Sequence, residues 1–363
     1  MDGPHTSRDV SASVSPTGDA LARRGLARAD LELSVLGVGG TGPGGLFEAT
    51  DGTESEAMLR DALAAGVTYF DTAPFYGFGL SERIMGDALR GTDTVLSTKV
   101  GRVLEPGAPP DPSALGWPGG LPFTPRFDYS YDAILRSHEH SLQRLGHASV
   151  DMLYVHDIGG MTHGEGNAVH RDALLDGGGL RALEELRDAG HVRAIGLGVN
   201  EIEVCLDLLD RARWDVILLA GRYTLLEQHA LDRLLPACEA AGTRIVCGGP
   251  FNSGVLVGGA TWNYAEAPTD VIRRVETLRA VAHEFGVPLP AMALQFPLAH
   301  PAVASVVPGP RDRAQLRGIL DWTRVDVPAA AWDALRERGV LHPDAPVPDG
   351  NPFYHADRPE HAP

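Results

Sequence analysis

Four side chains that could carry out proton transfer together stand at the ends of short apolar runs in this 363-residue sequence. Asp71 closes the run VTYFDT, with Tyr76 five positions later. Lys99 lies near the end of TVLSTK, and His156 ends VDMLYVH. A tyrosine with its ordinary pKa of about 10 is a poor acid or base at neutral pH, but a neighbouring ammonium favours its phenolate. We therefore expect Tyr76 to be the acid/base, tuned by Lys99, with Asp71 holding Lys99 and His156 hydrogen-bonding a substrate oxygen.

Each of these residues also has an ordinary structural explanation. Asp71 could cap a helix or loop, and Tyr76 could pack with neighbouring aromatic residues. Lys99 could be a solvated charge at the end of its strand, and His156 could be a satisfied histidine of the core. What favours a shared site is that all of them come at the same ends of consecutive strands.

The surrounding pattern predicts the fold that would bring them together. Apolar, β-branched runs alternate with helical patterns, which implies a parallel sheet. Eight such units without a Rossmann GxGxxG motif favour a closed (β/α)8 barrel, whose active site lies at the C-terminal ends of its strands. The eight predicted strands are the run near Val35, VTYFDT, TVLSTK, VDMLYVH, RAIGLGV, DVILLA, RIVCG and VASVVPG.

The predicted domain organisation is a single barrel over residues 28–340. Residues 1–27 are polar and expected to be disordered, and 341–363 form a C-terminal tail. Residues 101–128 contain seven prolines and no clear periodicity, but also Trp117, which favours a functional loop over a linker. Helices are expected to begin at the capping-box pattern Thr53–Glu56 and at Ser81, and another spans 130–145 before Gly146.

Composition limits the partners. A net charge of −17 argues against nucleic acid and anionic membranes. No run approaches 18 apolar residues, and the amino terminus lacks the apolar region of a signal peptide, so a reducing cytoplasm is expected. Cys205, Cys238 and Cys247 have no metal-binding or CxxC spacing, and Cys205 and Cys247 are interpreted as reduced core residues. We expect no metal, a small-molecule substrate, and a monomer or small homo-oligomer.

Over nearly all of residues 30–325 the sequence resembles the aldo-keto reductase family. The segment GVTYFDTAPFYGFGLSERIMGDAL is similar to the family's strand-loop-helix around its aspartate and tyrosine. VLSTKVGR resembles the segment with the family's lysine, and YVHD the one with its histidine. The resemblance implies a (β/α)8 barrel that binds a nicotinamide dinucleotide without a Rossmann motif. Hydride would pass between the nicotinamide and a substrate carbon while Tyr76 carries the proton.

The same resemblance implies a set of cofactor-binding residues. GLGVN supplies an asparagine for the nicotinamide carboxamide, CGGPFNSGVL a pyrophosphate loop, and VVPGPRDRAQL an adenosine-binding segment. Arg311 could offer a cation to the 2′-phosphate of NADP or pack against adenine. Because Gly309 and Gln315 stand where many NADP-preferring relatives carry basic residues, NAD is slightly favoured. The implied residues are Gly40, Thr41, Asn200, Gly249, Phe251, Ser253, Gly309, Arg311 and Gln315.

Two departures from the family pattern bear on the substrate. Gly248 stands where the family usually has an aromatic residue that stacks on the nicotinamide, and Ala220 lies near its usual glutamine. With FDYSYDAILRS, these features resemble the subgroup of D-threo-aldose 1-, L-fucose and pyridoxal 4-dehydrogenases, which mostly oxidise cyclic hemiacetals to lactones. We therefore expect an aldose 1-dehydrogenase.

Two other functions stay open: a carbonyl reductase or alcohol oxidoreductase for a pyridoxal-like or specialised metabolite, and a non-catalytic cofactor-sensing subunit. The intact proton-transfer residues weigh against the sensing subunit. The substrate pocket is expected to be shaped by the 101–128 loop and by Phe75, Trp117, Asp157 and Arg222.

Overall fold

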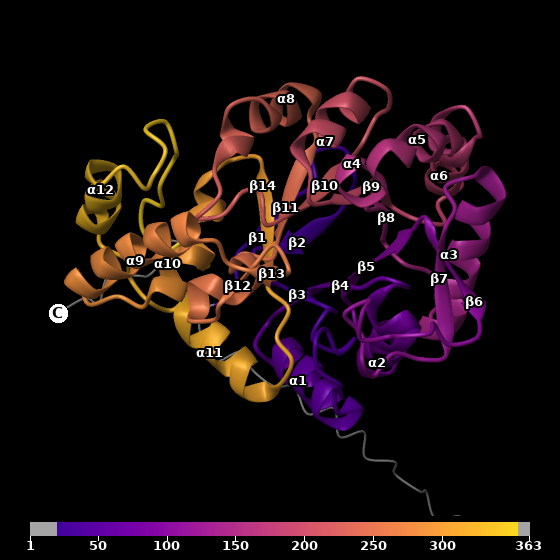
Figure 1. Ribbon diagram of the computed structural model, residues 1–363, viewed down its shortest axis with the longest axis horizontal. Coiled ribbons are helices and arrows are strands. Elements are labelled where there is room, and N and C mark those ends of the chain that lie inside the picture. The colour runs from indigo at the N-terminus through magenta and orange to yellow at the C-terminus, as the bar shows by residue number, and fades with distance from the viewer. Residues whose placement is uncertain (1–19, 355–363) are drawn as a thin grey trace, which may run out of the picture.

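A barrel of eight parallel strands forms the centre of the computed structural model, which describes residues 20–354 (Figure 1). Adjacent strands pair in parallel throughout, and the ends of the sheet meet where Leu36 bridges Val306 and the Val306 N–H donates to Val35 O at 2.9 Å. The predicted (β/α)8 fold is thereby confirmed. The strands are β3 (Gly37–Gly39), β4 (Tyr69–Asp71), β5 (Val95–Val100), β8 (Met152–His156), β9 (Ala194–Val199), β10 (Val216–Ala220), β11 (Arg244–Gly248) and β14 (Val303–Val307).

Helices surround this barrel because each strand returns to the next through a helix whose apolar face covers the sheet (Figure 1). The surrounding helices include α1 (Gly52–Ala64), α2 (Leu80–Leu89), α3 (Tyr131–Leu145), α6 (Gly179–Asp188), α7 (Ile202–Leu209), α8 (Leu234–Ala241), α10 (Leu289–Gln295) and α11 (Arg313–Thr323). Further helices are α4 (Gly160–His163), α5 (Asn167–Leu175), α9 (Thr269–Glu284) and α12 (Ala329–Glu337). Inside the barrel, Tyr69 and Tyr154 are fully buried, with hydroxyls 3.0 Å apart.

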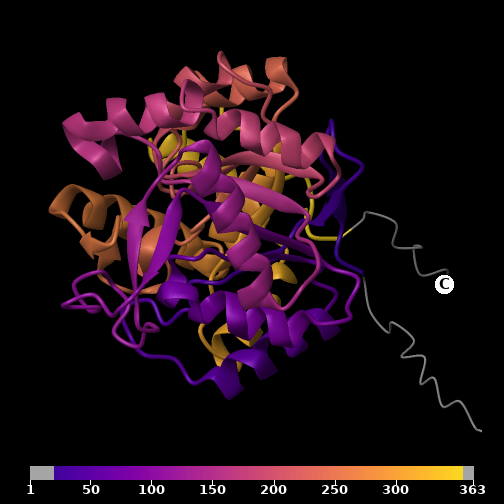
Figure 2. The ribbon, with the colours of Figure 1, turned by 90° about the vertical axis from the view of Figure 1, so that its right-hand side faces the viewer.

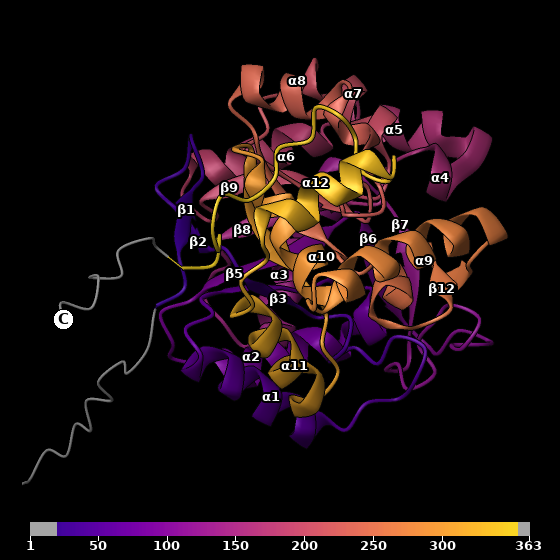
Figure 3. The same cartoon turned by 90° about the vertical axis from the view of Figure 1, so that its left-hand side faces the viewer.

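Hairpins lie at both ends of the barrel (Figures 2 and 3). One end carries the hairpin of β1 (Arg23–Gly25) and β2 (Glu32–Ser34). The other end carries two, formed by β6 (Arg102–Pro106) with β7 (Phe123–Phe127) and by β12 (Thr261–Trp262) with β13 (Ala265–Glu266). The second end is the C-terminal end of the barrel strands, where the sequence places the active site.

Two expectations about irregular segments need correction. Residues 101–128 are not a plain loop, because β6 and β7 pair over five residues each. Both strands contain a proline, which is unusual in paired strands, so the sequence did not indicate them. Residues 23–25, expected to be disordered, form β1, while residues 1–19 lie outside the described part of the chain. Residues 341–354 of the expected tail pack on the barrel, with Phe353 fully buried, and 355–363 also lie outside the described part.

Two predicted helix starts are also wrong. Asp51 caps α1, because its carboxylate accepts from the N–H of Thr53 at 2.9 Å. Ser81 lies buried within α2 after the left-handed Gly79, and its Oγ is 2.8 Å from Thr72 Oγ1. The end of α3 is as predicted, with Gly146 in the left-handed conformation after it, whereas the helix begins one residue later than predicted, at Tyr131, with Ser130 as its N-cap.

Within residues 20–354, no helix is long and apolar enough to cross a membrane. The three cysteines are free and buried, as the sequence indicated for Cys205 and Cys247. No group of three or more potential metal ligands occurs among the described histidines, cysteines and carboxylates.

Candidate active site

A buried ion pair forms the base of the site. Lys99 Nζ donates to Asp71 Oδ2 at 2.6 Å and to Thr72 O at 2.9 Å, and both charged side chains are almost fully buried. The second oxygen of Asp71 accepts from Ser97 Oγ at 2.7 Å. Lys99 is also the only lysine of the sequence. Because the strands carrying Asp71 and Lys99 are adjacent, the barrel itself fixes this pair.

Tyr76 and His156 lie directly beside the ion pair. Lys99 Nζ is 4.8 Å from the centroid of the Tyr76 ring, and the rings of Tyr76 and His156 meet edge to face at 5.7 Å. The loop that carries Tyr76 turns at Gly77, whose φ is +62° and where a Cβ would collide with the carbonyl of Gly44. The fold thus brings all four predicted residues together.

The protonation of Tyr76 differs from the sequence-based expectation. Burial, followed by the negative charges of Asp71 and Asp157, raises the pKa of the Tyr76 phenol well above its ordinary value, and Arg102 only partly opposes this. The free protein therefore holds Tyr76 as a neutral phenol that can donate a proton. The influence expected from Lys99 does not outweigh desolvation and the two carboxylates.

His156 is neutral in the free protein. Burial lowers the pKa of His156 well below its ordinary value, and the positive charges of Arg102 and Lys99 lower it further. Its carbonyl accepts a hydrogen bond from Tyr129 Oη at 2.8 Å, which anchors the end of β8. A neutral imidazole fits a hydrogen-bonding role toward a substrate oxygen.

This shift predicts how stability depends on pH. The unfolded chain binds a proton at His156 near pH 6.5 and the folded chain does not, so stability is lost as pH falls below about 6.5. The contribution of His156 approaches about 1.4 kcal/mol per pH unit in that range. Urea unfolding at pH 7.5 and 5.5 should show a smaller pH dependence in His156→Asn than in the wild type. Equal dependence in both proteins would contradict the assignment.

Three of the four candidate substrate residues lie beside Tyr76. Phe75 meets Trp117 edge to face at 5.6 Å, and Trp117 lies 5.5 Å from the Tyr76 ring. Asp157 follows His156 and places its carboxylate 3.5 Å from His156 Nε2. Phe75, Trp117 and Asp157 therefore lie next to Tyr76 or His156.

The fourth candidate, Arg222, is held by other groups. Its Nε donates to Asn200 O at 2.8 Å and its Nη1 to Asn263 Oδ1 at 2.9 Å. Asn263 lies in the turn of the β12–β13 hairpin, next to Tyr264, and both residues line the cavity described next. Arg222 therefore ties the hairpin to the end of β9, while within the described part of the chain its Nη2 donates only to Met161 Sδ, at 4.0 Å.

A cavity of about 710 Å³ extends from Tyr76 and Asp71 across the barrel end to α11. All nine residues implied to bind the cofactor line it. Beyond β11 the backbone of Asn252, Ser253 and Gly254 is left-handed at three successive positions, with φ values of +47°, +59° and +104°. Such runs turn backbone amides into an anion-binding hollow, as a pyrophosphate requires. The start of α11 also lines the cavity, where the helix dipole favours a phosphate. These residues fit a dinucleotide.

At the α11 end of the cavity, Arg311 is already paired. Its guanidinium forms an ion pair with Glu48 and donates from Nη2 to Leu46 O at 3.0 Å. Gln315 Oε1 accepts from the Arg311 N–H at 3.0 Å, so this side chain stabilises the local turn. Near the nicotinamide end, a Cβ on Gly248 would approach Leu218 Cδ2 to 3.0 Å, which limits side chains at that position.

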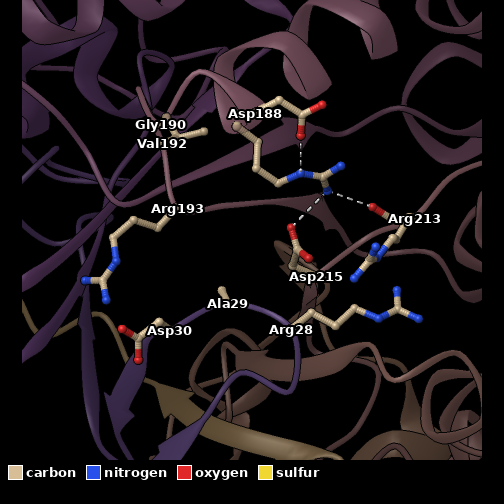
Figure 4. Close-up of a pocket in the computed structure, with 10 residues that line it drawn as sticks. Arg28, Ala29, Asp30, Asp188, Gly190, Val192, Arg193, Arg213 and Asp215 are labelled. Atoms are coloured by element: carbon tan, nitrogen blue, oxygen red, sulfur yellow. Dashed lines mark hydrogen bonds and ion pairs between the residues drawn. The ribbon is translucent and has the colours of Figure 1, made fainter.

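A second hollow, of about 430 Å³, lies at the opposite end of the barrel (Figure 4). Arg187 is one of its lining residues and donates to Asp215 at 3.2 Å and to the carbonyl of Arg213 at 3.1 Å. Asp215 in turn accepts from the N–H of Ile195 at 3.0 Å. These contacts join α6 to β9 and β10, so this hollow has a structural explanation.

Sequence reasoning missed several residues of the site. Arg102 forms an ion pair with Asp157, and Glu48 pairs with Arg311. Tyr264 is 54% exposed at the mouth of the cavity and has φ +63°, which a tyrosine rarely adopts. Arg102 lies three residues after Lys99 in the chain, and this closeness could have indicated that Arg102 belongs to the site. Glu48 and Tyr264 reach the site through loop conformations that have no sequence signature.

Comparison with known proteins agrees with this geometry. Residues 35–338 match the model of the aldo/keto reductase family. Pyridoxal 4-dehydrogenase from Microbacterium luteolum is 42% identical over 337 residues, covering 89% of this chain and 98% of that protein. D-threo-aldose 1-dehydrogenase from a Pseudomonas species is 36% identical over 340 residues, covering 90% and 99%.

Among solved structures, the holo form of an aldo-keto reductase from Bacillus halodurans superposes with a TM-score of 0.67. It is 26% identical, and the match covers 91% of this chain and 98% of that one. Fold, site geometry and sequence similarity therefore agree over nearly the whole described chain. The protein belongs to the aldo/keto reductase family and is an oxidoreductase whose cofactor is a nicotinamide dinucleotide.

Proposed function

We propose that the protein oxidises a cyclic hemiacetal to a lactone, with an aldose oxidised at C1 as the first candidate substrate. The observation that carries the proposal is the convergence of Asp71, Tyr76, Lys99 and His156 at one end of a cavity that fits the cofactor. Two relatives covered over nearly their whole length are a pyridoxal and an aldose dehydrogenase. Both names denote oxidation of a carbon that bears oxygen.

In the proposed mechanism the chain's own residues position and move a proton. The bound nicotinamide supplies the hydride acceptor. His156 hydrogen-bonds the anomeric oxygen and fixes it beside the Tyr76 hydroxyl. In the oxidative direction Tyr76 first gives up its phenol proton to solvent, and as phenolate it then takes the anomeric hydroxyl proton as C1 loses hydride. Lys99 Nζ lies 4.8 Å from the centroid of the Tyr76 ring, so its ammonium, held by Asp71, stabilises the phenolate until it takes that proton.

A pyridoxal-like substrate is the second candidate. Phe75, Tyr76 and Trp117 form an aromatic wall with ring centroids 5.5–5.6 Å apart where they meet Trp117. Such a wall suits a flat heteroaromatic ring as well as the apolar face of a sugar. The relative at 42% identity is a pyridoxal 4-dehydrogenase, and this similarity also favours a pyridoxal-like substrate.

The deciding experiment is a substrate panel. L-fucose, D-arabinose, galactose-type sugars and pyridoxal are offered with NAD and with NADP, and reduced cofactor is followed at 340 nm. The proposal predicts that at least one sugar or pyridoxal reduces the cofactor and yields a lactone. If none does, while an aldehyde is readily reduced, the protein is a carbonyl reductase instead. A protein that binds cofactor and turns over neither class would be a sensing subunit.

The Arg311–Glu48 pair supports a preference for NAD. The Glu48 carboxylate pairs with the guanidinium of Arg311, the cation that a 2′-phosphate would need. The negative charge of Glu48 would also repel the phosphate. Glu48→Gln should therefore lower the KM for NADP by about tenfold, the equivalent of ~1.4 kcal/mol, with a much smaller change for NAD. Steady-state kinetics with both cofactors measure this. An unchanged NADP to NAD ratio would remove Glu48 from the account.

We further propose that the protein works in a reducing cytoplasm, as a monomer or small homo-oligomer. Its three cysteines are free and buried, which supports a reducing environment. Light scattering coupled to size-exclusion chromatography would determine the oligomeric state.

A further inference from the structure

Arg102 and Asp157 form a charged pair beside Phe75 and His156. Arg102 begins β6, three residues after Lys99, and its guanidinium lies between the rings of Phe75 and Phe127, at 3.8 and 4.7 Å from their centroids. Arg102 Nη2 donates to Asp157 Oδ2. Only 8% of Arg102 is exposed, so its side chain is enclosed by its neighbours. Through the ion pair with Asp157, Arg102 anchors the β6–β7 hairpin to the end of β8.

Asp157 also lies next to the hydrogen-bonding nitrogen of the site. Its Oδ2 is 3.5 Å from His156 Nε2, and its backbone is fixed in a left-handed conformation, φ +48°, by the hydrogen bond from its N–H to Gly198 O at 2.9 Å. The Asp157 side chain is 22% exposed. Its second oxygen, Oδ1, accepts no side-chain hydrogen bond within residues 20–354. The carboxylate whose Oδ2 lies 3.5 Å from His156 therefore keeps Oδ1 as an acceptor.

Unsatisfied polar atoms gather around the same place. Arg102 Nε, His156 Nδ1 and Trp117 Nε1 are buried and have no hydrogen-bond partner among the described residues. All three side chains pack around Phe75. Since a buried polar atom without a partner costs about 1–3 kcal/mol, three in one cluster indicate a region built to receive polar groups of a ligand.

We infer that Asp157, held by Arg102, selects substrates with a hydroxyl group on the carbon next to the reacting carbon. His156 fixes the reacting oxygen, and the neighbouring oxygen of a vicinal diol then falls beside Asp157. A carboxylate only accepts hydrogen bonds, so it favours a hydroxyl there and repels a carbonyl oxygen. This inference rests on the proposed hemiacetal oxidation and narrows it to substrates hydroxylated beside the reacting carbon.

Arg102 acts through Asp157 as a positioning residue. Its ion pair holds Oδ2 beside His156, which leaves Oδ1 for the substrate. A purely structural role for the pair would affect all substrates alike, because the hairpin would move regardless of what is bound. Selective loss for one member of a substrate pair distinguishes the two roles.

The test uses an aldose from the panel that is turned over, paired with its 2-deoxy analogue. Wild-type protein should prefer the hydroxylated sugar by about 10²-fold or more in kcat/KM, because the analogue leaves a polar group of the site unpaired. Asp157→Asn should reduce this preference to about tenfold or less, chiefly by losing activity on the hydroxylated sugar. Asp128→Asn is the matched control: Asp128 has the same 22% exposed side chain and also pairs with an arginine, Arg126. It should keep the wild-type ratio.

The possible outcomes distinguish the selection by Asp157 from the proposed hemiacetal oxidation. If the wild-type protein has equal kcat/KM for the aldose and its 2-deoxy analogue, the selection by Asp157 is overturned, while hemiacetal oxidation stands. This comparison needs no variant. A ratio unchanged in Asp157→Asn also overturns it. If Asp157→Asn fails to fold, Asp157→Glu is used, and it too should lower the ratio because its carboxylate is displaced. Absence of turnover with every hemiacetal removes both the proposed function and this inference.

Discussion

Replacing Tyr76 by phenylalanine is expected to lower kcat by about 10²- to 10⁴-fold, the range that a positioned general acid or base contributes. Cofactor affinity should change little, because Asn200, the loop after β11 and the start of α11 make up most of the cavity. Intrinsic fluorescence or calorimetric titration with NAD measures binding, and absorbance at 340 nm measures turnover.

Tyr131→Phe provides the matched control for this prediction. Tyr131 lies on α3 and donates to Glu185, away from the cavity. Its loss should leave kcat unchanged. Undiminished turnover in Tyr76→Phe would remove Tyr76 from the acid/base role, and a parallel loss in both variants would point to a general effect on folding.

Replacing Lys99 by methionine is expected to damage stability and activity together. The change leaves Asp71 charged and unpaired where it is 3% exposed, and breaking a buried pair in this way costs about 3–5 kcal/mol of unfolding free energy. Turnover should also collapse, because the cation 4.8 Å from the centroid of the Tyr76 ring is lost. Urea unfolding and steady-state kinetics measure the two losses.

A double variant separates these effects. Asp71→Asn with Lys99→Met removes both charges, so most of the lost stability should return while activity stays absent. Recovery of turnover in the double variant would show that Lys99 serves the fold alone. Because Lys99 is the only lysine, an amine-directed reagent should modify the folded wild-type protein only at its amino terminus. Rapid modification of Lys99 would contradict its burial.

The barrel could be predicted because each strand is a short apolar run between helical patterns. The closeness of Asp71, Lys99 and His156 could be predicted for the same reason: each ends such a run, and parallel strands of a barrel open at one end. The resemblance to a known family then added the cofactor residues, all of which line one cavity in the structure.

What could not be predicted depends on side-chain contacts between loops. Arg222 looked free in the sequence, but Asn200 and Asn263 bind its guanidinium. The pKa of Tyr76 depends on the balance between desolvation and surrounding charges, and only the folded arrangement reveals that Asp71 and Asp157 both face it. The pairing of β6 with β7 was hidden by prolines that sit in and between the two strands.

We propose that substrate choice follows from these same loops. The β6–β7 hairpin contributes Arg102, the β8 end contributes Asp157, and the β12–β13 turn holds Tyr264 at the mouth. The barrel strands position the chemistry, while the loops at their ends select the molecule on which it acts.

The most direct test of the central claim follows the hydride itself. The best substrate of the panel is prepared with deuterium at the reacting carbon, and the reduced cofactor is analysed by mass spectrometry after incubation with wild-type protein and with Tyr76→Phe. We predict that wild-type protein transfers deuterium to the nicotinamide and releases a lactone, and that Tyr76→Phe forms almost none. Absence of deuterated cofactor with every substrate, or equal transfer by both proteins, would contradict the account.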